Sequence, residues 1–286
     1  MADFDNIFIY FDGWMLSALQ AAVRGSEDII SEVRLRVGKP IMLTVNSRTV
    51  PVASAREVTD DELSRVIYRL CERSVYTHSR EMSVGYISLR GGHRAGVSGE
   101  MGQNGMIRVK SVNIRVAHQV IGCADMIMLS MGRYADNAVI AGSPCSGKTT
   151  VLRDICRQLS LAGYSVGIVD ERGEIAGGGA FDLGRGCDIM SGCQKAEGIT
   201  MLLRSMSPQV IVFDEIGTAA DGEAVNRSLQ CGAAIITTVH ADSCSAARAR
   251  LQKLGVDERL CERIFVLDRD RPGTVIESSR IIGRAV

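Results

Sequence analysis

Residues 142–149 of this chain read GSPCSGKT and match the pattern G-x-x-x-x-G-K-[ST] at every fixed position. The apolar segment 138–141 before the motif predicts a short buried strand. The segment after it predicts a helix with one apolar face, formed by Val151, Leu152, Ile155 and Leu159. A strand, a glycine-rich loop and a helix in this order are the context that a phosphate-binding loop requires. We therefore expect an α/β domain that binds a nucleoside triphosphate.

The residue types in this loop fit the chemistry of phosphate binding. Glycines let the backbone fold around an anion, and N–H groups at the start of the helix then point at the phosphates. Lys148 is expected to neutralise the β- and γ-phosphate oxygens, and the Thr149 hydroxyl to bind Mg²⁺. The predicted nucleotide-binding residues are Gly142, Ser143, Pro144, Cys145, Ser146, Gly147, Lys148, Thr149 and Thr150.

A second apolar segment, residues 210–213, ends in the carboxylates of Asp214 and Glu215. A buried strand of this kind would deliver Asp214 to the Mg²⁺ shell, through water or through the Thr149 hydroxyl. Glu215 is then placed to orient or deprotonate the attacking water. Two acids at a strand end can also cap a helix, but beside a phosphate-binding loop we expect the catalytic role.

Two more predicted strands end in polar residues. One ends in a cluster of acids that contains Asp170, Glu171 and Glu174, and the other ends in His240. In an open parallel sheet both ends lie at the same edge as the phosphate-binding loop. We expect His240 to sense the γ-phosphate and to pass its presence to the rest of the domain.

The periodicity of the sequence changes near residue 120. Before that point, segments 33–37 and 41–45 predict strands, and residues 60–73 predict a helix that Thr59 or Asp60 caps. Residues 83–98 predict a hairpin around Gly91 and Gly92. After that point the expected strands are 138–141, 165–170, 209–214, 233–239 and 263–267, with helical segments between most of them. We therefore expect an α+β domain over residues 1–120 and a domain with a mostly parallel sheet over residues 121–286.

Composition narrows the classes of function. Basic and acidic residues number 33 each, which argues against binding nucleic acid through charge alone. No apolar run approaches the roughly 18–20 residues of a membrane span, and the acidic N-terminus lacks the basic region of a signal peptide. Nine cysteines with no C-x-x-C pair argue against a zinc site. We expect a cytoplasmic protein with reduced thiols.

The motifs resemble those of a known family in both identity and order. A phosphate-binding loop, an acid box at 170–174 and the segment TTVHA at 237–241 resemble the secretion (traffic) ATPases of type II and type IV systems. Over both domains the chain also resembles the stage III sporulation protein AA family. The similar segments include EVRLRVGKP at 32–40, GGHRAG at 91–96 and VDER at 169–172.

The resemblance implies a P-loop NTPase (RecA-like) C-terminal domain preceded by a smaller α+β domain. It also implies an ATPase that depends on Mg²⁺ and assembles as a ring, usually a hexamer. Such a motor would be recruited from the mother-cell cytoplasm to the membrane proteins of a secretion or sporulation channel. No direct contact with nucleic acid is expected.

The resemblance also implies roles for single residues. Asp214 becomes the Walker B acid and His240 the His-box residue. The catalytic base remains open between Glu215 and the acid-box residues Glu171 and Glu174, although Asp-Glu at 214–215, where the secretion ATPases often have Gly-Glu, favours Glu215. Ring motors also need a cation at the transferring phosphoryl group. The candidates are Arg94, Arg115, Arg172 and Arg204.

Two alternatives to a motor remain open. A nucleic-acid-dependent ATPase could use the basic segment 90–115 as its binding surface, but that segment lacks the interleaved aromatic residues of single-strand platforms. A nucleotide-gated assembly scaffold with low turnover would not need the full set of Lys148, Asp214 and Glu215. Stimulation by DNA or RNA would favour the first alternative, and very slow hydrolysis the second.

Overall fold

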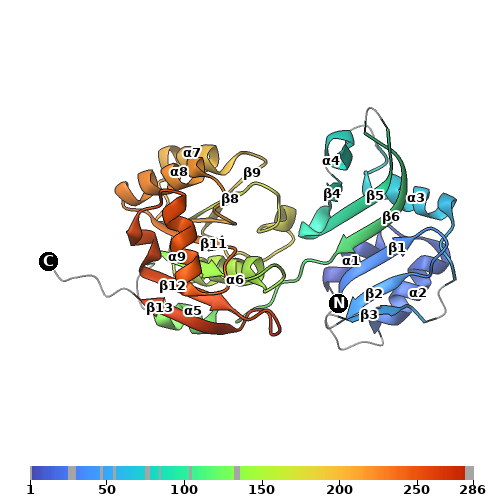
Figure 1. Cartoon of the computed structure of the whole chain (residues 1–286), viewed down its shortest axis with the longest axis horizontal. Coiled ribbons are helices and arrows are strands. Elements are labelled where there is room, and N and C mark those ends of the chain that lie inside the picture. Colours follow the sequence, from blue (N-terminus) through green and yellow to red (C-terminus); the bar gives the residue numbers. More distant parts are fainter. Residues whose placement is uncertain are drawn as a thin grey trace. The chain divides into compact units, whose positions relative to one another are not determined.

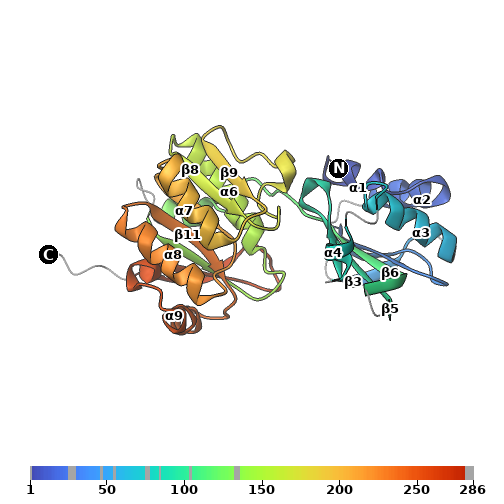
Figure 2. The same ribbon diagram turned by 90° about the horizontal axis from the view of Figure 1, so that it is seen from above.

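The computed structural model describes residues 2–24, 30–45, 48–53, 56–74, 78–83, 85–102, 105–131 and 136–280. The chain divides into two compact units, Met1–His118 and Gln119–Val286. Each unit has its own sheet and its own helices (Figures 1 and 2).

The N-terminal unit contains an antiparallel sheet with the strand order β3-β2-β1-β6-β5-β4. Its strands are β1 (Ile30–Arg36), β2 (Met42–Val45), β3 (Arg48–Pro51), β4 (Tyr86–Ser88), β5 (Arg94–Gly102) and β6 (Gly105–Arg115). Helices α1 (Ala2–Phe8), α2 (Gly13–Arg24) and α3 (Asp60–Leu70) cover one face of this sheet (Figure 2). The short helix α4 (Ser79–Ser83) contacts β4 and β6.

Apolar and basic side chains alternate along β1, which explains why the sheet has one buried and one open face. Val33 and Leu35 are fully buried in the core below the helices, whereas Arg34 and Arg36 lie on the other face. The expected hairpin is also present, because β4 and β5 pair antiparallel on either side of a 3₁₀ turn at Arg90–Gly92.

Helix α3 begins with a reciprocal cap. The Thr59 hydroxyl accepts a hydrogen bond from the Glu62 amide, and the Glu62 carboxylate accepts one from the Thr59 amide. Burial alone would raise the pKa of Glu62. Hydrogen bonds from the Thr59 amide, the Trp14 indole and the Arg56 guanidinium outweigh burial, and the pKa falls to about 2. A motif recognisable from sequence thus carries a buried, ionised carboxylate.

The C-terminal unit contains a sheet with the order β13-β12-β7-β11-β10-β8-β9, in which every neighbouring pair except β12 and β13 is parallel. The expected strands are present as β7 (Ala138–Ala141), β8 (Val166–Asp170), β10 (Val210–Phe213), β11 (Ala234–Val239) and β12 (Arg263–Leu267). The edge strands β9 (Cys187–Ser191) and β13 (Val275–Arg280) were not expected.

Helices cover both faces of this sheet. Helix α6 (Lys148–Leu161) packs on one face, and α7 (Lys195–Ser205), α8 (Ala219–Gln230) and α9 (Cys244–Lys253) pack on the other (Figure 2). The short helix α5 (Asp125–Met131) precedes β7. Because β7, β11 and β10 are neighbours, the loops that follow them meet at one edge of the sheet. Among the residues described above, no helix is both long and apolar enough to cross a membrane.

Candidate nucleotide site

The phosphate-binding loop connects the buried strand β7 to the first turn of α6. Gly147 has a φ of +86° and forms the N-cap of the helix. A Cβ atom at this position would lie 2.8 Å from the Gly273 nitrogen, so the loop accepts only glycine here without a shift. The Ser146 hydroxyl is buried in the same loop and has no hydrogen-bond partner among the described residues. The loop therefore has the geometry of a cradle for phosphate.

Lys148 is buried beneath this loop. Its ammonium group donates to the carbonyl oxygens of Gly142 at 3.0 Å and Ser143 at 2.9 Å. It also lies 3.2 Å from Nδ1 of His240. Burial lowers the pKa of Lys148, and the charges of Asp214 and Glu215 oppose that shift. The ammonium is thus held inside the loop by groups that phosphate oxygens can replace.

The end of β10 brings the first acid to the loop. The Thr149 hydroxyl donates to Oδ2 of Asp214 at 2.7 Å, and the Thr238 hydroxyl donates to Oδ1 of the same carboxylate. The Glu215 amide in turn donates to the Thr238 hydroxyl at 3.0 Å. Thr238 lies on β11, so one buried hydroxyl holds both acids of the neighbouring strand. Thr238 was not among the site residues predicted from the sequence.

Glu215 and His240 face each other across the ends of β10 and β11. Oε2 of Glu215 lies 3.5 Å from Nε2 of His240, and Oε1 lies 3.7 Å from a guanidinium nitrogen of Arg250. Arg250, which lies on α9, also donates to the His240 carbonyl at 3.4 Å. The imidazole therefore lies between Lys148 and Glu215. Arg250 was not predicted either, since nothing in its local sequence pattern distinguishes it from a surface arginine.

The acid box lies at the end of β8 and has different contacts. The buried carboxylate of Asp170 accepts hydrogen bonds from the amides of Ile175 at 3.0 Å and Ala176 at 2.8 Å, so it closes a turn. Glu171 is exposed and forms an ion pair with Lys195 at 3.0 Å.

The turn is also held by a buried arginine. The carbonyl oxygen of Glu174 accepts a hydrogen bond from Arg153 at 2.6 Å, and the Arg153 guanidinium lies 4.1 Å from the centre of the Phe181 ring. These contacts link the acid box to its own loop and to α6 and α7.

Two of the four candidate cations, Arg172 and Arg204, belong to the C-terminal unit, and Arg94 and Arg115 belong to the N-terminal unit. Arg204, in the last turn of α7, and Arg172 are exposed, and no ion pair joins either to another described residue. In the N-terminal unit, the Arg94 guanidinium stacks on Tyr86 at 3.6 Å from the ring centre, and Arg115 lies 3.8 Å from Glu32.

The residues present fit Mg²⁺ bound together with phosphates. Thr149 and Asp214 offer a hydroxyl and a carboxylate within hydrogen-bond distance of each other, and both are hard oxygen ligands of the kind that Mg²⁺ selects. No group of three or more His, Cys, Asp and Glu side chains able to hold a metal occurs among the described residues. A metal here would therefore complete its shell with water and phosphate oxygens.

Comparison with solved structures shows which fold this is. The pilus retraction motor PilT with bound ADP superposes with a TM-score of 0.65 at 15% identity, over 89% of this chain and 78% of PilT. The ATPase DotB of Yersinia pseudotuberculosis superposes with a TM-score of 0.62 at 17% identity, over 90% of this chain and 75% of DotB. The expected fold class is confirmed: a P-loop NTPase domain with a mostly parallel sheet, preceded by a smaller α+β domain.

Comparison of sequences shows the family. Stage III sporulation protein AA of Bacillus subtilis (strain 168) is 37% identical over 265 residues, which span 86% of this chain and 85% of that protein. The family model described as "Sporulation stage III, protein AA" matches residues 15–282. The chain therefore belongs to the stage III sporulation protein AA family.

Proposed function

We propose that this protein is a Mg²⁺-dependent ATPase that works as an oligomeric motor of the secretion-ATPase type. The observation that carries the proposal is the convergence of Lys148, Thr149, Asp214, Glu215 and His240 at one sheet edge. The pilus retraction motor PilT, solved with bound ADP, and the ATPase DotB share this fold, and they support ATP as the nucleotide and a motor as the role.

Each residue of the cluster has a role that follows from its position. The loop amides and Lys148 would bind the phosphates, and Thr149 and Asp214 would hold Mg²⁺. When bound, Mg²⁺ neutralises the charge that develops on the phosphate oxygens. Glu215 orients the attacking water and accepts its proton. We place the base at Glu215 because its carboxylate adjoins His240, whereas Glu171 is paired with Lys195.

His240 is suited to report the state of the nucleotide. Its Nδ1 contacts the ammonium of Lys148, and its Nε2 faces the carboxylate of Glu215. When Lys148 turns from the loop carbonyls to a phosphate, this contact changes. His240 transmits the change to Glu215 and, through Arg250, to α9. A cation from Arg94, Arg115, Arg172 or Arg204 would complete the site on assembly.

The sporulation family supports the cellular role that we propose. In spore formation the ring would bind the cytoplasmic side of a membrane channel or secretion complex, through the membrane proteins of that complex. Two measurements test the proposal. Phosphate release from ATP should require Mg²⁺, and light scattering on Glu215→Gln with ATP and Mg²⁺ should show a ring of about six subunits. Phosphate release without Mg²⁺ would contradict the assigned metal. A monomer both with and without ATP and Mg²⁺ would contradict a ring formed by this chain alone.

A further inference from the structure

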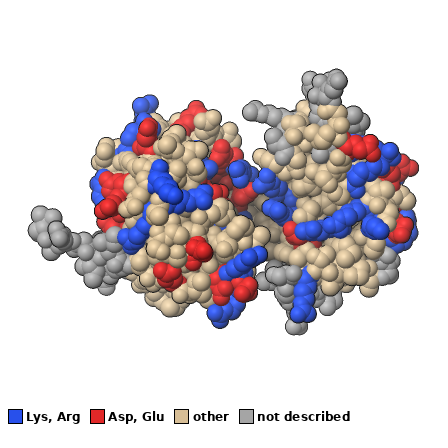
Figure 3. Space-filling model, viewed as in Figure 1, with Lys and Arg blue, Asp and Glu red and all other residues tan. Residues whose placement is uncertain are grey.

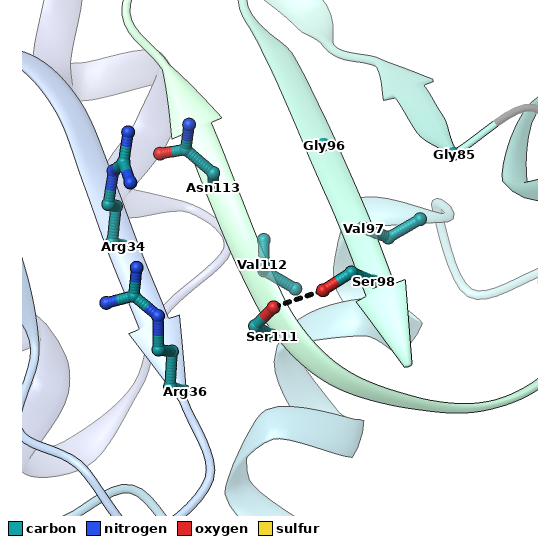
Figure 4. Close-up of a pocket in the computed structure, with 9 residues that line it drawn as sticks. All are labelled: Arg34, Arg36, Gly85, Gly96, Val97, Ser98, Ser111, Val112 and Asn113. Carbon is teal, nitrogen blue, oxygen red and sulfur yellow. Dashed lines mark hydrogen bonds between the residues drawn. The ribbon is translucent and has the colours of Figure 1, made fainter. Parts of the chain in front are cut away.

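The open face of the N-terminal sheet carries a shallow cavity of about 170 Å³ (Figure 4). Arg34 and Arg36 border it from β1, Ser111 and Asn113 from β6, and Ser98 from β5. A cavity holds a water molecule when about 10–15 Å³ is open to it, so this one has room for a phosphate-sized ion. It lies wholly within the N-terminal unit, and none of its residues belongs to the nucleotide site.

Strand register explains why these side chains meet. Arg34 lies directly opposite Asn113, and Arg36 lies opposite Ser111. On the other side of β6, Ser98 pairs with Ser111. Side chains two residues apart on a strand share a face, so three neighbouring strands present polar groups to one hollow.

Gly96 borders the hollow from β5. It lies opposite Asn113, next to Ser98 on the same face of the sheet, and it contributes no side chain. A Cβ atom there would meet only the Asn113 carbonyl oxygen, at the ordinary contact distance of 3.8 Å. The sheet would thus accept a larger residue at this position, and the absence of a side chain leaves the cavity open.

The walls of the cavity are rich in donors. Arg34 forms an ion pair with Glu32 at 2.6 Å, whereas Arg36 is exposed and no ion pair joins it to another residue in the described part of the chain. The hydroxyls of Ser98 and Ser111 lie 2.6 Å apart. One of their two hydrogens serves that bond, so the other is left to donate to a ligand. Figure 3 shows Lys and Arg side chains gathered across this unit.

The side-chain amide oxygen of Asn113 is an acceptor in the cavity wall, and it favours an anion that can also donate a hydrogen bond. The amide nitrogen of Asn113 donates to Glu32 at 3.1 Å, while its amide oxygen is buried without a partner among the described residues. In Figure 4 that oxygen points toward Arg34. A carboxylate can only accept hydrogen bonds. A singly protonated phosphate has several acceptor oxygens and also one O–H donor, so it can satisfy both kinds of wall group.

We propose that this cavity binds the phosphate group of a small soluble molecule. Arg36 supplies a bidentate, charge-assisted contact, the serine pair supplies a hydroxyl donor, and the Asn113 oxygen accepts the phosphate O–H. Arg34, which forms an ion pair with Glu32, contributes further positive charge to the cavity.

The test is a titration of the full-length, isotope-labelled protein with inorganic phosphate, followed by NMR. The amides of Ser98 and Ser111 report on this cavity, and those of Gly142 and Gly147 report separately on the phosphate-binding loop. We expect saturable shifts at Ser98 and Ser111. Glutamate at the same concentration, which offers carboxylates alone, should produce much smaller shifts.

Variants show whether the named residues make the site. Arg36→Ala should weaken the binding reported by Ser111 at least about tenfold, because it removes a charge-assisted contact. Gly96→Val should abolish that binding by placing a side chain in the cavity, and a β-branched residue suits a strand. Arg65→Ala, an exposed arginine of α3, is the control and should bind as wild type. Shifts confined to the phosphate-binding loop, equal shifts with glutamate, or unchanged binding in Arg36→Ala and Gly96→Val would each overturn the proposal.

Discussion

The hydroxyl of Thr238 offers the sharpest test of how the two acids are held. Thr238→Val keeps the shape of the side chain but removes the hydrogen bond to Asp214 and the acceptor of the Glu215 amide. A hydrogen bond to a charged group contributes about 1.5–3 kcal/mol, and an unpaired buried N–H costs about 1–3 kcal/mol. Because the Glu215 amide is only partly buried, we take the low end of each range, which gives a total loss of about 2.5 kcal/mol.

This loss should be visible in both stability and turnover. For a unit of 150–250 residues, each kcal/mol lowers Tm by roughly 2–4 °C, so the calorimetric transition of the C-terminal unit should fall by about 5–10 °C. Phosphate release should slow at least about tenfold, which corresponds to about 1.4 kcal/mol of transition-state stabilisation. The reason is that neither Asp214 nor Glu215 keeps its position.

The neighbouring residue provides a matched control. Thr237 is also fully buried on β11, but its hydroxyl has no hydrogen-bond partner among the described residues. Thr237→Val therefore removes an unsatisfied polar group and should leave Tm unchanged or raise it. Equal destabilisation by the two substitutions, or normal turnover in Thr238→Val, would refute the reasoning.

Three further predictions concern other parts of the molecule. His240→Ala should keep most of the ATP affinity but lower turnover, and unchanged turnover in a phosphate-release assay would reduce His240 to a packing residue. Gly147→Ala should abolish ATP binding because its Cβ would meet Gly273. The control is Gly163→Ala, which also has a positive φ but has nothing within 4 Å of the added Cβ, so it should lower stability only. Equal ATP binding by the two variants in calorimetry would contradict this prediction. Because folding lowers the pKa of Glu62 from 4.5 to about 2, its stabilisation is complete above pH 4.5 and is lost as the pH falls through 2. Trp14 fluorescence during acid titration should show this loss in wild type and not in Glu62→Gln, and identical titrations would contradict it.

Much of the fold was predictable because its signals are local. The strands β7, β8, β10, β11 and β12 are short apolar segments, and the parallel sheet follows from their alternation with helices. The edge strand β9 escaped prediction because its residues are only half buried and mix polar with apolar side chains. The strand β13 escaped because β12 and β13 form an antiparallel hairpin at the edge of a sheet that otherwise alternates strand and helix.

The candidate site also combines residues that local sequence motifs predict with residues that only the structure brings together. The loop at 142–149 and the acids at 214–215 have a recognisable spacing, so their meeting could be expected. The contact between Thr238 and Glu215 joins residues 23 positions apart in the sequence. The contact between Arg250 and His240 joins residues 10 positions apart. The sequence around them does not reveal those contacts. The turn that Asp170 closes is likewise visible only in the structure, since an acid after a strand has the same local pattern in either role.

The measurement that tests the central claim most directly is the identity of the nucleotide bound to Glu215→Gln after incubation with ATP and Mg²⁺. We predict that this variant binds ATP through the intact loop and retains it unhydrolysed, while Glu171→Gln releases ADP and phosphate as wild type does. Recovery of ADP from Glu215→Gln, together with trapped ATP in Glu171→Gln, would contradict the account and move the catalytic base to the acid box.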